Sequence, residues 1–425
     1  MTTNRRGFIG GVSAAALAST AGSAWAQTKS PSIYDPGATD TELRIGHFCP
    51  YTGPSAEYGA IGKAHEAFWK SVNDKGGING RKVTFLSRDD TGLPSKSLEV
   101  TRELVEQEKV LCLFNPLGTA ANTAIQPYMN ENKVPQLFVA SGSSKWGNPT
   151  DFPWTMGFQP DYRFEASAYA KHALATVKDP KFGVLMQNDE YGKDYYAGIR
   201  DVVGEDVDVI KVMSYDVTDE SIDSKITDLK EFGANVFINI STPKFAVQAI
   251  RKAAEIDWKP RHYLNNVSLS KAAVMEPAGF ENCQGIISGT YLKDATNRTW
   301  DKDAEMKVWR AWMSKYMPEA DTSNGYYVFA YAAASLMKET LRKCGNDLTR
   351  ANVMKQASSL QNVRVPMVLP KLLINTSPTA YYPIKFIQLS QFSGQVWNPL
   401  IEFIKNARSE AEPIDEARAP EPASR

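Results

Sequence analysis

The feature that most constrains this chain is an alternation of short apolar segments with segments of helical periodicity, and the alternation occurs twice. Strands are predicted at 43–48, 83–86, 110–114 and 136–140, and again at 182–186, 207–213, 235–240, 263–264 and 286–292. Between them, apolar residues recur at helical spacing, as Ile222, Ile226 and Leu229 do. This alternation predicts parallel sheets covered by helices on both faces. Two such series in 425 residues, without a flexible linker, predict an α/β protein of two lobes that share one cleft.

The later part of the chain indicates a return between the lobes. The segments 301–316 and 324–342 are predicted to be long helices, and Thr349 has the character of an N-cap for another. Strands are predicted again at 368–373 and 384–389. Helices followed by late strands indicate that the chain crosses back between lobes instead of ending in the second one.

Both ends of the chain have compositions that differ from a folded core. Arg5 and Arg6 precede an apolar run rich in Gly and Ala, which ends at a small-x-small cleavage signal over 24–26. This pattern predicts a twin-arginine signal peptide over 1–26, cleavage after Ala26 and a mature protein in the periplasm. The segment 406–425 is rich in Pro, Ala and Glu and is predicted to be disordered.

The charge balance, the spacing of cysteines and histidines, and the motifs that are missing make several functions improbable. Lys plus Arg and Asp plus Glu each number 48, and no basic stripe is present, so nucleic acid and anionic membrane surfaces are poor partners. Cys49, Cys112, Cys283 and Cys344 have no C-x-x-C spacing and leave three disulfide pairings open. The four histidines have no metal-site spacing, so no metal or other cofactor is expected. A nucleophile elbow, a P-loop and a G-x-G-x-x-G motif are all missing, so the chain is not expected to be an enzyme.

Hydroxyls and glycines gather in the loops that follow three predicted strands of the first series. These loops are 50–59, 115–119 and 140–144. In open α/β sheets, ligands bind beyond the carboxyl ends of the strands, and helix N-termini there favour an anion. Any one of these loops alone is better explained as an ordinary turn and cap. Three loops that converge on one edge predict a site for a carboxylate.

Three ordered segments, TELRIGHFCPYTGPSAEYG, NDKGGINGRKVTFLSRDD and NDEYGKDYY, resemble the leucine/isoleucine/valine-binding family of periplasmic binding proteins. The resemblance extends from about residue 41 to residue 400. It implies two Rossmann-like lobes joined by three crossovers, the type I fold, with 41–158 and 292–362 in lobe 1 and 159–291 and 363–405 in lobe 2. It also implies a monomeric receptor that binds a solute between its lobes and delivers it to a membrane ABC permease.

The resemblance also implies a ligand site. The matching positions are Tyr58, Thr119, Ala140, Ser141, Gly142, Gln159, Tyr191, Thr242, Asn266 and Tyr326. Thr119 and the backbone of 140–142 are expected to hold a carboxylate, and the three tyrosines to line the pocket. For any single tyrosine, packing in the core is an equally good explanation.

Departures from the family pattern bear on the ligand. Gln159 and Asn266 occupy positions where amino-acid receptors of this family carry acidic residues, and Thr242 a position that is often aromatic. A buried ammonium needs an anionic partner, and no Asp or Glu is near Asn266 in the sequence. The sequence therefore favours an aromatic or other amine-free acid, with a branched-chain amino acid or an amide as alternatives. A periplasmic enzyme and a ligand-presenting sensor subunit are further alternatives. Gly92 and Gly118 stand where some members carry a disulfide, so that bond is not expected.

Overall fold

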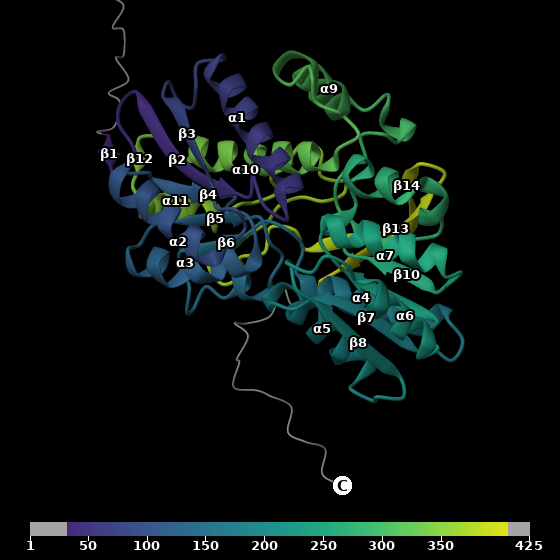
Figure 1. Ribbon diagram of the computed structural model, residues 1–425. Helices are drawn as coiled ribbons and strands as arrows, with labels where there is room; N and C mark the ends of the chain where they lie inside the picture. Colours follow the sequence, from purple (N-terminus) through teal and green to yellow (C-terminus); the bar gives the residue numbers. More distant parts are fainter. Residues whose placement is uncertain (1–31, 407–425) are drawn as a thin grey trace, which may run out of the picture. The chain divides into compact units, whose positions relative to one another are not determined.

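The computed structural model describes residues 32–406, so the predicted signal peptide over 1–26 and nearly all of the predicted tail over 406–425 lie outside the described residues. Within this part, the strands form a five-stranded sheet, β3-β2-β4-β5-β6, and a seven-stranded sheet, β14-β13-β11-β10-β9-β7-β8 (Figure 1). The first sheet is parallel throughout, and antiparallel pairing in the second is confined to β13 and β14. The predicted α/β fold with parallel-rich sheets is confirmed.

The first sheet comes from the N-terminal half of the chain. Its strands and the helices between them are β2 (Glu42–Cys49), α1 (Gly59–Asn73), β3 (Lys82–Asp89), α2 (Pro94–Arg102), β4 (Cys112–Phe114), α3 (Thr119–Glu131), β5 (Gln136–Val139) and β6 (Thr155–Gly157). Phe48 and Leu113 face a cluster formed with α2 and α3, whereas Ile45 and Phe114 pack in the cluster of α1. Because successive side chains of a strand point to opposite faces, both faces of this sheet are buried under helices.

The second sheet repeats this plan. Its elements are α4 (Tyr162–Thr176), β7 (Phe182–Gln187), α5 (Glu190–Val203), β8 (Ile210–Tyr215), α6 (Asp223–Glu231), β9 (Val236–Ile240), α7 (Pro243–Glu255), β10 (Arg261–Leu264), α8 (Glu276–Ala278), β11 (Ile287–Thr290), β13 (Phe386–Ser393) and β14 (Val396–Lys405). Val184 packs with α4 and α5, and its neighbour Leu185 packs with α6 and α7. Both faces of the sheet are again covered, as a parallel sheet requires.

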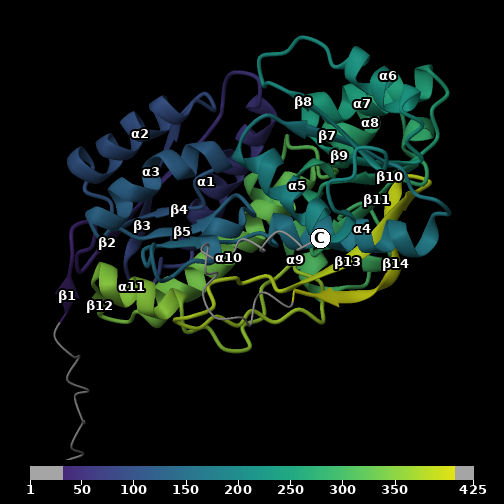
Figure 2. The same cartoon turned by 90° about the horizontal axis from the view of Figure 1, so that it is seen from below.

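The chain returns to the first sheet before it adds the last two strands of the second. The returning elements are α9 (Ala304–Tyr316), α10 (Gly325–Lys343), β12 (Asp347–Leu348) and α11 (Arg350–Ala357), and β12 pairs with β1 (Ile33–Tyr34). In both views α10 lies beside elements from the start of the chain, and its buried face packs against that of α1 (Figure 2). The path between the sheets therefore crosses three times, after β6, after β11 and before β13.

Residues 363–384, which the sequence assigned to lobe 2, pack into the core around the first sheet. Met367, Ile374 and Ile384 are members of that cluster. The strand predicted at 368–373 is wrong: this segment makes turns, with a single bridge between Leu292 and Val368. Pro370 has no backbone N–H to donate to a ladder, which explains why the apolar pattern there does not continue as a strand.

Element boundaries differ from the predictions in detail. β8 begins at Ile210, and Val207, predicted to belong to it, is 78% exposed. Thr349 is an N-cap, as predicted, because its hydroxyl accepts the N–H of Asn352 (3.2 Å). The four cysteines are free and buried. No helix within residues 32–406 combines the length and apolar character needed to cross a membrane.

Candidate functional site

A cavity of about 600 Å³ is lined by segments of both sheets. Eight of the ten predicted site residues line it: Tyr58, Thr119, Ala140, Gln159, Tyr191, Thr242, Asn266 and Tyr326. Ser141 and Gly142 are not on its wall; Ser141 lies behind Thr119 and is fully buried, and a side chain at Gly142 would meet the carbonyl oxygen of Pro160 at 2.2 Å. Tertiary structure thus brings eight of the predicted residues to one cavity, and the other two lie behind its surface.

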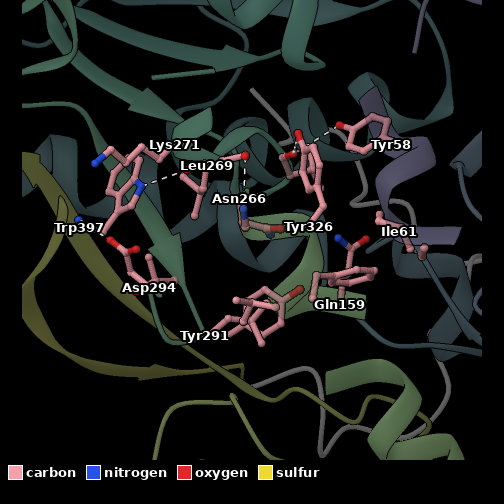
Figure 3. A pocket seen from close by; sticks show the side chains of 18 of the residues that line it. Tyr58, Ile61, Gln159, Asn266, Leu269, Lys271, Tyr291, Asp294, Tyr326 and Trp397 are labelled. Atoms are coloured by element: carbon pink, nitrogen blue, oxygen red, sulfur yellow. Dashed lines mark hydrogen bonds between the residues drawn. The ribbon is translucent and has the colours of Figure 1, made fainter. Parts of the chain in front are cut away.

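The cavity is elongated, as Figure 3 shows. Tyr58, Ile61 and Gln159 lie at one side of the view, Trp397 and Asp294 at the other, and Asn266, Leu269 and Tyr291 between them. Trp397 donates its indole N–H to the carbonyl oxygen of Leu269 (3.1 Å), so its ring is fixed along the wall. None of the residues of this far side was predicted from the sequence, because they come from the crossing segments and from the missed strand β14.

Hydrogen-bond donors face the cavity at the N-terminus of α3. Gly118 precedes this helix with a φ of +99°, and no side chain caps the helix. Its first N–H groups have no intrahelical acceptor, and Ala120 and Ala121 line the cavity. Uncapped N–H groups and the helix dipole favour a negatively charged ligand group at this point.

The direction of the hydrogen bonds behind Thr119 makes its hydroxyl a donor. The Oγ of Ser141 accepts the N–H of Ser143 (3.2 Å) and the indole N–H of Trp146 (3.0 Å). Both acceptor positions of Ser141 are therefore used, which favours donation of its own proton to the Oγ1 of Thr119, 2.7 Å away, over the reverse direction. The proton of Thr119 itself remains for a ligand in the cavity.

Tyrosines from both halves of the molecule form the aromatic wall. Tyr58 and Tyr326 pack with ring centroids 5.1 Å apart, and both donate their hydroxyls to the carbonyl oxygen of Val267 (3.3 Å each) (Figure 3). Tyr191 packs edge-on against Tyr162. Burial raises the pKa of Tyr58 and Tyr191 well above that of an exposed tyrosine, so both hydroxyls stay neutral. A flat apolar group can pack against such a wall.

Two acidic groups, one on the cavity wall and one directly behind it, were not placed there by the sequence analysis. Glu165 of α4 is fully buried behind Asn266 and accepts the backbone N–H of Asn266 (2.8 Å) and its side-chain Nδ2. Burial raises the pKa of Glu165 to about 7, although its hydrogen-bond donors favour the ionised form. Asp189, the N-cap of α5, also lines the cavity. No Asp or Glu is near Asn266 in the sequence, but Glu165 contacts it in the structure, because α4 packs against the end of β10.

A sequence signal existed for one of these acids only. Asp189 stands directly before α5, and Asp is a common N-cap residue; its carboxylate accepts the N–H groups of Tyr191 and Gly192 (3.0 and 3.2 Å). Glu165 sits inside a helix, 101 residues from Asn266, and nothing in its surroundings marks it. Asp89 braces a loop and accepts the N–H groups of Tyr51 and Thr91 (2.9 Å each), in keeping with a structural role for this acid.

A two-sheet α/β fold with a ligand-sized cavity lined by segments of both sheets is typical of a solute-binding protein of the type I class. This chain belongs to the periplasmic binding protein family, whose sequence profile matches residues 42–383. Leu/Ile/Val-binding protein homolog 1 of Brucella suis is 24% identical over 373 residues, 84% of this chain and 90% of the relative. The resemblance noted from the sequence is thereby confirmed.

Two solved structures share the fold. A branched chain amino acid ABC transporter protein from Thermus thermophilus with bound valine has a TM-score of 0.76 at 16% identity and covers 88% of this chain and 98% of its own. A fatty acid ABC transporter substrate-binding protein from Thermomonospora curvata has a TM-score of 0.74 at 18% identity and covers 90% and 97%. At these identities the likeness concerns the fold, and the two differ in the solute that they are named for.

Proposed function

We propose that this chain is a periplasmic receptor that binds a small carboxylate-bearing solute in the cavity and delivers it to a membrane ABC permease. The observation that carries the proposal is the donor set on the cavity wall: the hydroxyl proton of Thr119 and the free N–H groups at the start of α3. A carboxylate accepts several hydrogen bonds at once and is favoured at a helix N-terminus.

The size and lining of the cavity support an aromatic or other amine-free acid. Its volume of about 600 Å³ lies within the range of about 300 to 1,000 Å³ that drug-sized ligands occupy. A branched-chain amino acid would leave much of this space to water. Tyr58, Tyr191 and Tyr326 offer ring faces to a flat or extended apolar body.

A branched-chain amino acid is the second candidate. Relatives are named for leucine, isoleucine and valine, and one neighbour in fold holds valine. Asp189 on the wall and Glu165 behind Asn266 would offset part of the cost of desolvating an ammonium. Because these two acids could partly compensate a buried ammonium, charge alone does not exclude amino acids. Titration of both ligand classes against the protein decides between them.

The test is calorimetry on the mature protein after its bound solute has been removed by unfolding and refolding. Benzoate-type and cinnamate-type acids, fatty acids, and leucine, isoleucine and valine are titrated separately, and the methyl ester of each binder serves as its control. We expect an amine-free acid to bind more tightly than the three amino acids, and each ester to bind much more weakly than its acid. Esters that bind as well as the acids would contradict the carboxylate site.

A further inference from the structure

The buried carboxylate of Glu165 decides whether Asn266 offers a hydrogen-bond donor or an acceptor to the cavity. Glu165 accepts hydrogen bonds from the backbone and side chain of Asn266 and from the hydroxyls of Tyr169 and Tyr195 (3.0 Å for Tyr195). The two Asn266 groups and the Tyr195 hydroxyl donate to it, whereas the Tyr169 hydroxyl also lies 3.0 Å from the carbonyl oxygen of Leu264 and can donate to either acceptor. An ionised carboxylate has no proton to donate, so a carbonyl oxygen cannot form a hydrogen bond with it.

This arrangement orients the amide of Asn266. Its nitrogen faces Glu165, and above about pH 7, where this carboxyl is ionised, Glu165 can only accept. The carbonyl oxygen therefore lies at the other end of the amide, and among residues 32–406 no side chain or backbone group donates to it. Asn266 lines the cavity, so this oxygen is an acceptor that awaits a partner there.

Tyr191 also offers a hydrogen-bond acceptor to the cavity, for a reason that does not involve Glu165. Asn265 donates its Nδ2 to the carbonyl oxygens of Ser241 and Asn239 (3.1 Å each), so its Oδ1 accepts the hydroxyl proton of Tyr191. The proton of Tyr191 is thereby used, and its oxygen can only accept from a ligand. Asn266 and Tyr191 thus both present acceptors to the cavity, opposite in character to the donor hydroxyl of Thr119.

We propose that Glu165 is a positioning residue that holds Asn266 as an acceptor, so that the receptor selects a carboxylate that also carries a hydrogen-bond donor, a hydroxyl or an amine. The inference rests on the proposed carboxylate function and narrows it. A ligand that has a carboxylate and no donor buries the carbonyl oxygen of Asn266 without a partner. Sites built to pair with a hydroxyl or N–H reject the analogue that lacks it.

Two matched ligand series test this selectivity by calorimetry at about pH 8, where Glu165 is ionised. The first is 4-hydroxybenzoate, 4-methoxybenzoate and benzoate; the second is leucine, 2-hydroxy-4-methylpentanoate and 4-methylpentanoate, which share one carbon skeleton. In the series that the wild type binds, we expect the donor-bearing member to bind at least about tenfold more tightly than the member without a donor. The second series also separates an amine from a hydroxyl.

Variants connect the selectivity to Glu165. Glu165→Gln introduces an amide nitrogen that competes with the Nδ2 of Asn266, so the Asn266 amide is free to turn; we expect the tenfold preference to fall to about threefold or less. Asn266→Ala removes the acceptor and should abolish the preference. Tyr195→Phe is the matched control: it removes another donor from the same carboxylate and leaves both Glu165 and Asn266 in the chain, so it should lower the melting temperature and keep the preference.

The outcomes are distinguishable. Equal affinity for donor-bearing and donor-free acids in the wild type overturns the inference and leaves the carboxylate receptor intact. An unchanged preference in Asn266→Ala also overturns it, and this variant decides the matter even if Glu165→Gln does not fold. A preference lost equally in Tyr195→Phe would show a general packing role for Glu165 instead of a positioning one. If no carboxylate of either series or of the wider screen binds, the proposed function itself fails.

Discussion

At the scale of single residues, the direction of each hydrogen bond around the cavity decides what a side chain offers to a ligand. Thr119 is expected to donate to a ligand because both acceptor positions of Ser141 are occupied by the N–H groups of Ser143 and Trp146. The residue type alone does not decide this, since a threonine hydroxyl both donates and accepts. The direction of these hydrogen bonds therefore cannot be predicted from the sequence and depends on how the side chains pack.

Thr119→Ala removes the side-chain donor of the carboxylate site. We expect ligand binding to weaken by about 1.5–3 kcal/mol, the range for a hydrogen bond to a charged group. Because the backbone N–H groups of α3 persist, some affinity should survive. Thr119→Ser keeps the hydroxyl and serves as the control in calorimetric titrations. Wild-type affinity in Thr119→Ala would remove this residue from the site.

Glu165 should make the stability of the protein depend on pH in a defined direction. Its folded pKa of about 7 lies above the ordinary value of 4.5, because burial disfavours the charge. The folded state therefore holds the proton more tightly than the unfolded chain does. The stability from this group is fully present below about pH 4.5 and is lost as the pH rises through about 7.

The measurement compares the free energy of unfolding of the wild type and Glu165→Gln, obtained by urea denaturation at pH 4.5, 6 and 8. The value for the wild type relative to the variant should fall across this range by a few kcal/mol, on the order of that expected from the shift. Parallel pH profiles would mean that Glu165 is not perturbed in the folded state.

At the scale of elements, the start of α3 depends on a backbone conformation that glycine adopts easily. Gly118 has φ +99° and ψ 143°, a region that costs a residue with a side chain on the order of 1–3 kcal/mol. Gly118→Ala should lower the stability by about this amount and also weaken ligand binding, because the strain is relieved by moving the N–H groups of α3. Calorimetry and urea denaturation measure the two effects separately.

Gly204→Ala is the control for this prediction. Gly204 ends α5 with φ +83°, has no neighbouring atom within 4 Å of an added Cβ and does not line the cavity. It should show a comparable loss of stability with unchanged affinity. Equal loss of affinity in both variants would mean that binding follows stability alone and not the geometry of α3.

At the scale of the whole molecule, ligand contacts made by both sheets are expected to favour one arrangement of the two halves. Thr119 contributes from the first sheet and Asn266 from the second, so a ligand that contacts both gains most when they approach each other. Small-angle scattering with and without a confirmed ligand should show a smaller radius of gyration in the bound state. The melting temperature should rise with ligand concentration, by mass action. An unchanged radius would contradict closure of the two halves on the ligand.

What the sequence by itself determined was the class of fold and a set of candidate residues, most of which line one cavity. Apolar periodicity reports local structure and burial, so the strands at 43–48, 83–86 and 182–186 and the capping role of Thr349 could be predicted from it. The ordered motifs indicated the family, and eight of the ten residues carried over from it line one cavity.

Tertiary structure alone decided which acidic group lies behind the cavity wall. Glu165 reaches Asn266 across 101 residues because α4 packs against the end of β10, and neither the spacing nor the composition of the chain encodes that contact in a readable way. The turns at 368–373 and the strand at 396–405 likewise depend on which partner the segment finds, since an apolar run forms a strand only where a neighbour completes its hydrogen bonds. The sequence thus set which segments are buried, and long-range packing set which polar groups meet and in which direction they donate.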